Sequence, residues 1–315
     1  MGEVALRGFL GGSDVAAALG LSPWKTPVAL YHEKLAALAG EATQDSDSLA
    51  KRRGKRWEAV ALEMLLDSLS EREIHANVVE TNIRYSMLDT PWMSAEVDAV
   101  LRVGGADWNV EIKTVSPFAG RDWGDPESDE IPTHYAAQVQ WGLMVTGRQT
   151  CVVGALFGAD VMKPYLVERD EEVIAWLRQG AIDFWNNHVL AGVPPQPKTL
   201  ADVLALHPRG TGTILHADER LTSLALTYRQ AHAELKAREA EIDRLEFEIA
   251  NAMRDAAVLT LDEKAKPVFV FKPEEGPYLD QAKLKAEFPE AHKACMTKWQ
   301  KRVLRYKPFD AKGVL

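Results

Sequence analysis

The stretch SAEVDAVLRVGGADWNVEIK, residues 94–113, decides the fold of the N-terminal half of this chain. Both ends of it alternate apolar and polar residues, and Gly104-Gly105 between them is typical of a β-hairpin turn. Alternate residues of a strand share one face, so Glu111 and Lys113 point together while their neighbours point into the core. Asp98 lies on the partner strand and can reach the same face. The stretch therefore predicts two carboxylates and an ammonium group on one side of an otherwise apolar sheet.

That arrangement is suited to a divalent cation. Two carboxylates, from Asp98 and Glu111, suit Mg²⁺, which takes few protein carboxylates and keeps positions for water and phosphate. The backbone carbonyl of Ile112 can add a third ligand. The cation would lower the pKa of a bound water, and Lys113 would hold that water or the developing negative charge. The alternative is a solvated ion pair on an edge strand, and the sequence leaves both open.

A basic run opens the helix that is expected to begin near Leu49. Residues 51–56 contain five cations in six positions, and Glu58 follows beside the buried stripe of the helix. Lysine and arginine attract phosphate, so the run, Arg53 included, can deliver nucleic acid to acids that include Glu58. A solvated charged first turn explains the same run.

A second helix, expected at 133–146, carries Tyr135 and Gln138 on one face because they are three residues apart. Gln138 can hydrogen-bond a nucleophilic water or a phosphate, and Tyr135 can contact a nucleic-acid backbone. Core packing is the plainer interpretation of Tyr135.

Hydrophobic periodicity places the other elements of the N-terminal half. Helices are expected at 13–20, 28–39, from 49 onward, 133–146 and 170–190, and strands at 78–85, 92–103, 108–115, 151–157 and 161–167. The fold class is therefore α/β (α+β), with a mixed central sheet flanked by helices. A proline-rich segment ends this domain, which spans 1–197.

Residues 198–315 are expected to form a mainly helical region. Apolar residues from Leu221 to Ala256 recur at alternating steps of three and four, which predicts one long amphipathic helix at about 218–257. A strand at 268–271 and a helix at 280–306, interrupted at Pro289, should follow. Residues 281–315 hold nine Lys and Arg against three acidic residues, so the end of the chain is basic.

Composition excludes several classes of protein. The 315 residues are 46% hydrophobic and 26% charged, with no apolar run long enough to span a bilayer and no recognisable export signal. Two cysteines are too few for a zinc or iron–sulfur site of their own, and no phosphate-binding P-loop occurs. We expect a cytoplasmic protein without membrane contact. Residues 1–200 carry 28 acidic and 18 basic side chains, so nucleic acid would need a local basic track.

Taken in order, five motifs resemble the lambda-exonuclease family, also described as YqaJ-like viral recombinases, within the PD-(D/E)xK nucleases. The resemblance covers roughly residues 7–190, and the motifs are Gly12-Ser13-Asp14, Gly54-x-x-x-Glu58, Asp98, Glu111-x-Lys113 and Gln138-x-Gln140. The family's proline before the first acid is absent, since Val97 precedes Asp98. The resemblance implies a restriction-endonuclease-like core.

The resemblance also implies an activity. It points to an ATP-independent, Mg²⁺-dependent exonuclease that degrades one strand of double-stranded DNA from its 5′ end, with Mn²⁺ able to substitute. The 3′ overhangs would serve phage-type recombination with a single-strand annealing protein, and the enzyme would be a ring-shaped homotrimer encoded by a phage or prophage. Carried over by position, Asp98, Glu111, the Ile112 carbonyl and Glu58 hold metal, Lys113 activates water and Gln138 positions the nucleophile.

The DNA contacts implied by the resemblance are less regular. Ser13 with Arg7 resembles a pocket for the 5′-phosphate, and Arg121 resembles a basic residue on the DNA path. The spacings around Arg7 and Arg121 differ slightly from the family pattern. Two other functions stay open on the same scaffold, namely a structure- or site-specific endonuclease and a non-catalytic DNA-binding platform.

Overall fold

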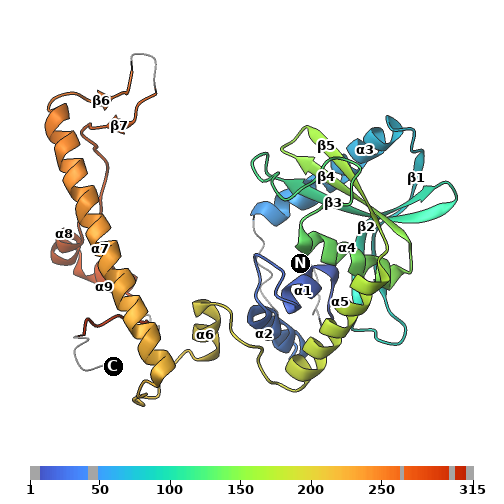
Figure 1. Cartoon of the computed structure of the whole chain (residues 1–315), viewed down its shortest axis with the longest axis horizontal. Helices are drawn as coiled ribbons and strands as arrows, with labels where there is room; N and C mark the ends of the chain where they lie inside the picture. The colour runs from blue at the N-terminus through green and yellow to red at the C-terminus, as the bar shows by residue number, and fades with distance from the viewer. Residues whose placement is uncertain (1–7, 42–48, 263–265, 298–301, 310–315) are drawn as a thin grey trace. The chain divides into compact units, whose positions relative to one another are not determined.

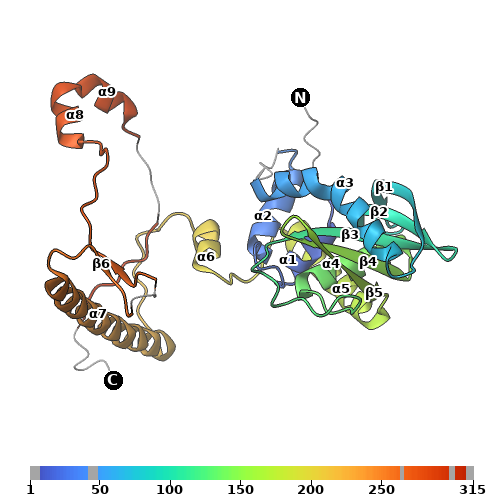
Figure 2. The same cartoon turned by 90° about the horizontal axis from the view of Figure 1, so that it is seen from above.

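The computed structural model describes residues 8–41, 49–262, 266–297 and 302–309. Contacts between Cα atoms divide the chain into two compact units, Met1–Leu206 and His207–Leu315. The first unit contains the sheet and every predicted site residue, and Figures 1 and 2 show it from two directions. Each unit is described by itself below.

A five-stranded mixed sheet forms the centre of the first unit, in the order β1-β2-β3-β4-β5. The strands are β1 (Ala76–Ser86), β2 (Ser94–Val103), β3 (Ala106–Val115), β4 (Thr150–Phe157) and β5 (Val161–Glu168). Neighbouring strands are antiparallel except β3 and β4, which run parallel because a helix connects them. The predicted mixed sheet and hairpin are confirmed.

One face of the sheet is covered by α3 (Leu49–Ser70), which crosses it in Figure 2. Its residues Leu65 and Leu69 are fully buried against four apolar side chains of β2, β3 and β4, which are Ala99, Leu101, Val110 and Val152. Gly154 lets the helix lie close, because a Cβ atom there would come within 3.1 Å of the Leu65 side chain. The periodic stripe of this helix therefore faces the sheet, as its spacing predicts.

The opposite face is covered by α4 (Thr133–Thr146), with α1 (Gly12–Ala18), α2 (Pro27–Leu38) and α5 (Glu171–Phe184) beyond it (Figure 1). Trp141 of α4 is fully buried there, and its indole N–H donates to the Ser94 carbonyl at 2.8 Å. The helix expected at 170–190 is not uniform, since residues Trp185–Leu190 form a π-helical segment after α5. The predicted helices on both faces are otherwise confirmed.

The first unit extends past the proline-rich segment to a short helix, α6 (Leu200–Leu206). Asp202 is buried and ties this helix to the N-terminal part, because its carboxylate accepts from the Thr26 hydroxyl at 2.5 Å. The unit therefore ends nine residues later than the expected boundary at 197. A proline cluster marks a break in secondary structure, and only the packing of α6 reveals that the unit continues.

The second unit consists of α7 (Glu219–Met253), α8 (Gln281–Glu287), α9 (Pro289–Cys295) and a short pair of strands, β6 (Val258–Leu259) and β7 (Phe269–Val270). Asp218 caps α7 by accepting the Leu221 N–H at 2.7 Å. The helix expected through 306 was wrong at its end, because α9 stops at Cys295 and residues 302–309 are not helical. None of the helices in the described ranges is long and apolar enough to cross a membrane.

Candidate active site

The hairpin places Asp98 where the backbone ladder between β2 and β3 stops. Register pairs run from Val103↔Ala106 to Ala99↔Val110 and go no further. Beyond the last pair, a side chain replaces the backbone as acceptor, because Asp98 Oδ2 accepts the Ile112 N–H at 2.6 Å. Asp98 is therefore held by the backbone of the strand that carries the other predicted site residues.

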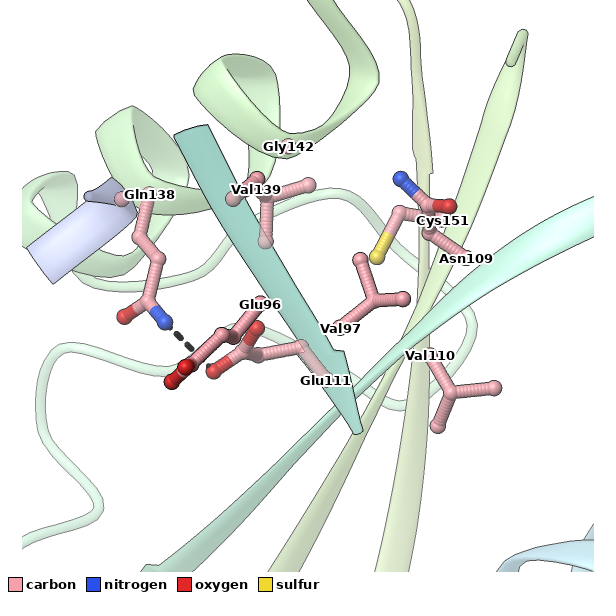
Figure 3. Close-up of a pocket in the computed structure, with 11 residues that line it drawn as sticks. Glu96, Val97, Asn109, Val110, Glu111, Gln138, Val139, Gly142 and Cys151 are labelled. Atoms are coloured by element: carbon pink, nitrogen blue, oxygen red, sulfur yellow. Dashed lines mark hydrogen bonds between the residues drawn. The ribbon is translucent and has the colours of Figure 1, made fainter. Parts of the chain in front are cut away.

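Glu111, Lys113 and Gln138 form a closed triangle of contacts across β3 and α4. Lys113 Nζ lies 2.5 Å from Glu111 Oε1 and donates to Gln138 Oε1 at 3.1 Å. The Gln138 amide completes it by donating to the same Glu111 oxygen at 2.6 Å, as Figure 3 shows. Glu111 Oε1 therefore makes two contacts, and its orientation is fixed by residues that lie 2 and 27 positions away in the sequence.

Burial gives these groups unusual protonation. Burial first, and then the charge of Glu111, raises the pKa of Asp98 from 3.8 to about 8, although Lys113 and the Ile112 N–H oppose the rise. Burial alone would lower the pKa of Lys113, but the carboxylates of Glu111 and Asp98 outweigh it and keep that pKa above its usual value. Lys113 is consequently an ammonium ion near neutral pH, and Asp98 keeps its proton there.

Glu58 reaches the same site from α3, the helix that covers the face of the sheet opposite to α4. Its charge contributes to raising the pKa of Asp98, so the two carboxylates interact. Its Oε1 is buried and has no hydrogen-bond partner among the described residues. Gly54, one turn earlier, faces Thr114 of β3, with 3.9 Å between its would-be Cβ and the Thr114 hydroxyl oxygen. The Gly54-x-x-x-Glu58 motif therefore brings α3 over the end of β3.

The donor set fits a hard divalent cation in part. The Asp98 carboxyl keeps a proton, and the buried Oε1 of Glu58 has no hydrogen-bond partner among the described residues. A bound cation would replace the proton of Asp98 and would supply a partner for the Glu58 oxygen. Within the described ranges, however, no group of three or more Asp, Glu, His or Cys side chains has the arrangement of a metal site. Glu111 Oε1 already contacts Lys113 and accepts from the Gln138 amide.

A basic cleft lies at the start of α3. It has a volume of about 350 Å³ and is lined by Arg52, Arg53, Arg56 and Trp57. Both Arg53 and Arg56 are exposed. The predicted charge run therefore forms a concave surface on the helix that also carries Glu58, with an aromatic side chain in its wall.

The predicted phosphate-binding residues that the structure describes come from different elements of the fold. Ser13 is exposed at the start of α1, next to Gly12, and a Cβ atom at Gly12 would lie 2.9 Å from Gln138 Cγ. Tyr135 belongs to the site, because Lys113 Nζ lies 4.8 Å from the centre of its ring. Arg121 is exposed in the loop between β3 and α4, and Arg7 lies outside the described residues.

The helix that carries Ser13 is anchored by an ion pair that the sequence did not reveal. Gly11 is the N-cap of this helix, and the Asp14 carboxylate accepts the Gly11 N–H at 3.1 Å. The Asp14 carboxylate also meets Lys34 Nζ at 2.7 Å, and both side chains are buried. The available signal was Lys34 itself, which falls on the buried stripe of α2 with Leu30 and Tyr31.

Two aromatic residues beside the site were also missed. His134 precedes Tyr135 in α4, and its Nε2 is buried without a partner in the described part of the chain. Trp24, in the turn before α2, contacts the His134 ring with centroids 4.6 Å apart. A tryptophan between Pro23 and Lys25, in the short segment between the helices expected at 13–20 and 28–39, was a usable signal, because turns seldom carry large apolar side chains.

A small cavity separates α4 from the hairpin beneath Gln138. Its volume is about 10 Å³, which is room for about one water molecule. The side chains that line it include Glu96, Asn109, Glu111 and Cys151 (Figure 3). It is too small to admit substrate, so substrate does not reach Glu111 through it.

Part of this chain is similar to a known protein family. Residues 4–149 match the model of the YqaJ-like viral recombinase domain. The chain is 27% identical over 297 residues to the YqaJ protein of Bacillus subtilis (strain 168). The aligned region covers 91% of this chain and 87% of that protein.

Solved structures with similar folds include two exonucleases. An alkaline exonuclease (LHK-Exo) of Laribacter hongkongensis matches with a TM-score of 0.46 and 19% identity, over 59% of this chain and 90% of that one. A phage-related exonuclease of Haemophilus somnus 129PT matches with a TM-score of 0.40 and 12% identity, over 58% and 96% respectively.

Proposed function

We propose that this protein is a metal-dependent nuclease, on the premise that residues 4–149, which match the model of the YqaJ-like viral recombinase domain, act as a member of that family. The observation that carries the proposal is the convergence of Asp98, Glu111, Lys113 and Gln138 at the end of one hairpin. In finer terms, the proposed reaction is Mg²⁺-dependent, ATP-independent removal of nucleotides from a 5′ end of double-stranded DNA.

Asp98, Glu111, the Ile112 carbonyl and Glu58 are the proposed holders of the cation. When bound, the cation would supply a water of lowered pKa and neutralise charge on the scissile phosphate. The raised pKa of Asp98 supports this assignment, because burial and the charge of Glu111 disfavour the ionised carboxylate and a nearby cation would stabilise it. The orphaned Oε1 of Glu58 supports it independently.

Lys113 and Gln138 have separate proposed roles. The ammonium of Lys113 is protonated, so it donates to the attacking water or to the phosphate oxygen on which charge develops, and it does not act as a base. Gln138 holds Lys113 and Glu111 at a fixed separation through both ends of its amide. Losing Gln138 should therefore disturb two groups at once.

The route of the DNA is proposed from charge. The cleft of Arg52, Arg53 and Arg56 would contact the phosphate backbone, which needs local basic groups because the N-terminal half is acidic. Ser13, Arg7 and Arg121 are proposed contacts of the 5′-phosphate. We propose further that the protein is cytoplasmic and phage-encoded, forms a ring-shaped homotrimer, and hands its 3′ overhangs to a single-strand annealing protein.

A linear duplex with one labelled 5′ end tests the proposal. With Mg²⁺ and without ATP, release of labelled mononucleotide and a lengthening 3′ overhang are expected. Discrete internal fragments would instead make the protein an endonuclease. Asp98→Ala should abolish cleavage, whereas Glu63→Gln, on the exposed side of α3, should not. Cleavage that survives in EDTA or in Asp98→Ala would refute the metal site, and DNA binding with no cleavage by the wild type would make the chain a binding platform.

A further inference from the structure

Trp24 is an aromatic side chain that the proposed chemistry leaves unused. It is 72% exposed, more than any other tryptophan in the described ranges, the next being Trp176 at 53%. The turn that carries it is ordered by local hydrogen bonds, because Ser22 Oγ accepts the N–H groups of Trp24 at 3.3 Å and Lys25 at 3.2 Å. A large apolar ring is thus held in water by a fixed backbone.

The ring is supported from one side by the first turn of α4. Its centroid lies 4.6 Å from that of His134, edge to face at 87°, and 6.0 Å from that of Tyr135. Burial, and then the charge of Lys113, lowers the pKa of His134, so the imidazole is neutral near pH 7. The support is therefore an aromatic packing contact that sets the orientation of the indole, and it leaves most of the ring surface free.

The supporting residues connect Trp24 directly to the reactive groups. Tyr135 contacts Trp24 on one side and lies under the Lys113 ammonium at 4.8 Å on the other. Lys113 in turn contacts Glu111. One aromatic residue, Tyr135, therefore lies between the exposed indole and the Lys113 ammonium.

We propose that Trp24 is a stacking platform for a nucleobase of the bound strand, next to the scissile phosphate. The inference rests on the proposed nuclease function and adds a subsite to it. Base–aromatic stacking contributes about 1–3 kcal/mol per base, and it tolerates every base because each has a flat face. A sequence-tolerant contact is what a nuclease that advances along a strand requires at this position.

The test is binding without cleavage, measured on the full-length protein in EDTA. The probe is a duplex with a 5′-phosphate that carries 2-aminopurine at each of the first few positions in turn. Stacking on an indole quenches this base, so one position should show quenching by the wild type. Trp24→Ala should lose the quenching and bind about 5- to 150-fold more weakly, which corresponds to ~1–3 kcal/mol. Trp24→Phe should restore most of the affinity.

Trp176→Ala is the matched control, because it removes an exposed tryptophan of α5 that lies outside the site. Unchanged affinity and unchanged quenching in Trp24→Ala would overturn the inference. A change in oligomeric state, measured by sedimentation, with no change in DNA binding would show that Trp24 contacts another copy of the chain, and would overturn it too. Because cleavage is not measured, loss of quenching is distinguishable from failure of the proposed nuclease activity.

Discussion

Replacing Asp98 by asparagine should make the metal-free protein more stable. The pKa of this carboxyl is raised from 3.8 to about 8 by burial and by Glu111, so near pH 7 the folded chain keeps a proton that the unfolded chain has released. The stability it contributes is therefore fully present below about pH 4 and is lost as pH rises toward 8. About three pH units at 1.36 kcal/mol each give a deficit of up to ~4 kcal/mol near pH 7.

Asparagine escapes this deficit because it has no proton to release. Its side-chain oxygen can still accept the Ile112 N–H that Asp98 accepts at 2.6 Å, so the hairpin end stays closed. In urea unfolding with EDTA near pH 7, Asp98→Asn should be more stable than the wild type, and the gain should shrink as pH falls toward 4. Glu63→Gln, an exposed acid-to-amide change on α3, should alter stability little.

A divalent cation should make the wild type more stable than Asp98→Asn, which reverses the order of stability in EDTA. Mg²⁺ or Mn²⁺ binds the ionised carboxylate, so it should stabilise the wild type, with an affinity that rises about tenfold per pH unit up to about pH 8 and then levels. Asp98→Asn should gain little from the cation and should not cleave DNA. If the variant is less stable than the wild type in EDTA, or if both proteins gain equally from Mn²⁺, the reasoning about Asp98 is refuted.

Three further predictions concern the surroundings of the site. Lys34→Met leaves the buried Asp14 carboxylate without its 2.7 Å partner and should lower the free energy of unfolding by about 3–5 kcal/mol, measured by urea denaturation. Equal stability of the variant and the wild type would contradict the role given to this ion pair. Gly12→Ala places a Cβ 2.9 Å from Gln138 Cγ and should lower kcat on the order of tenfold through displacement of Gln138, whereas Gly54→Ala meets only ordinary contact at 3.9 Å. A chain ending at Leu206 should keep a cooperative unfolding transition and metal-dependent cleavage, and loss of cleavage from a still-folded truncation would show that His207–Leu315 contributes to catalysis.

Sequence reasoning performed well where a pattern depends on neighbours in the chain. Strand alternation around the Gly104-Gly105 turn predicted that Glu111 and Lys113 share a face, and their side chains meet at 2.5 Å. It had no signal to use where a contact joins segments that are distant in the sequence. The end of the first unit depends on Asp202 bonding Thr26, which lies 176 residues away, and no local periodicity reports such a contact.

The same division holds within the site. That Gln138 and Glu111 belong together came from the family resemblance, since they are 27 residues apart on different elements. That one amide bridges Glu111 and Lys113 became visible only in the structure. Glu58 was placed near the sheet by its helical stripe, but its orphaned oxygen and its effect on the pKa of Asp98 depend on how closely α3 approaches β3.

The sequence by itself determined the order of helices and strands, the hairpin and the faces of its strands, because these follow from repeat periods of two and about 3.6 residues and from turn-forming glycines. Tertiary structure alone decided which carboxyl keeps its proton, which lysine is buried with Asp14, and which aromatic rings Trp24 contacts. Those properties arise from burial and from contacts between distant segments, and desolvation is a property of the packed environment that no single segment encodes.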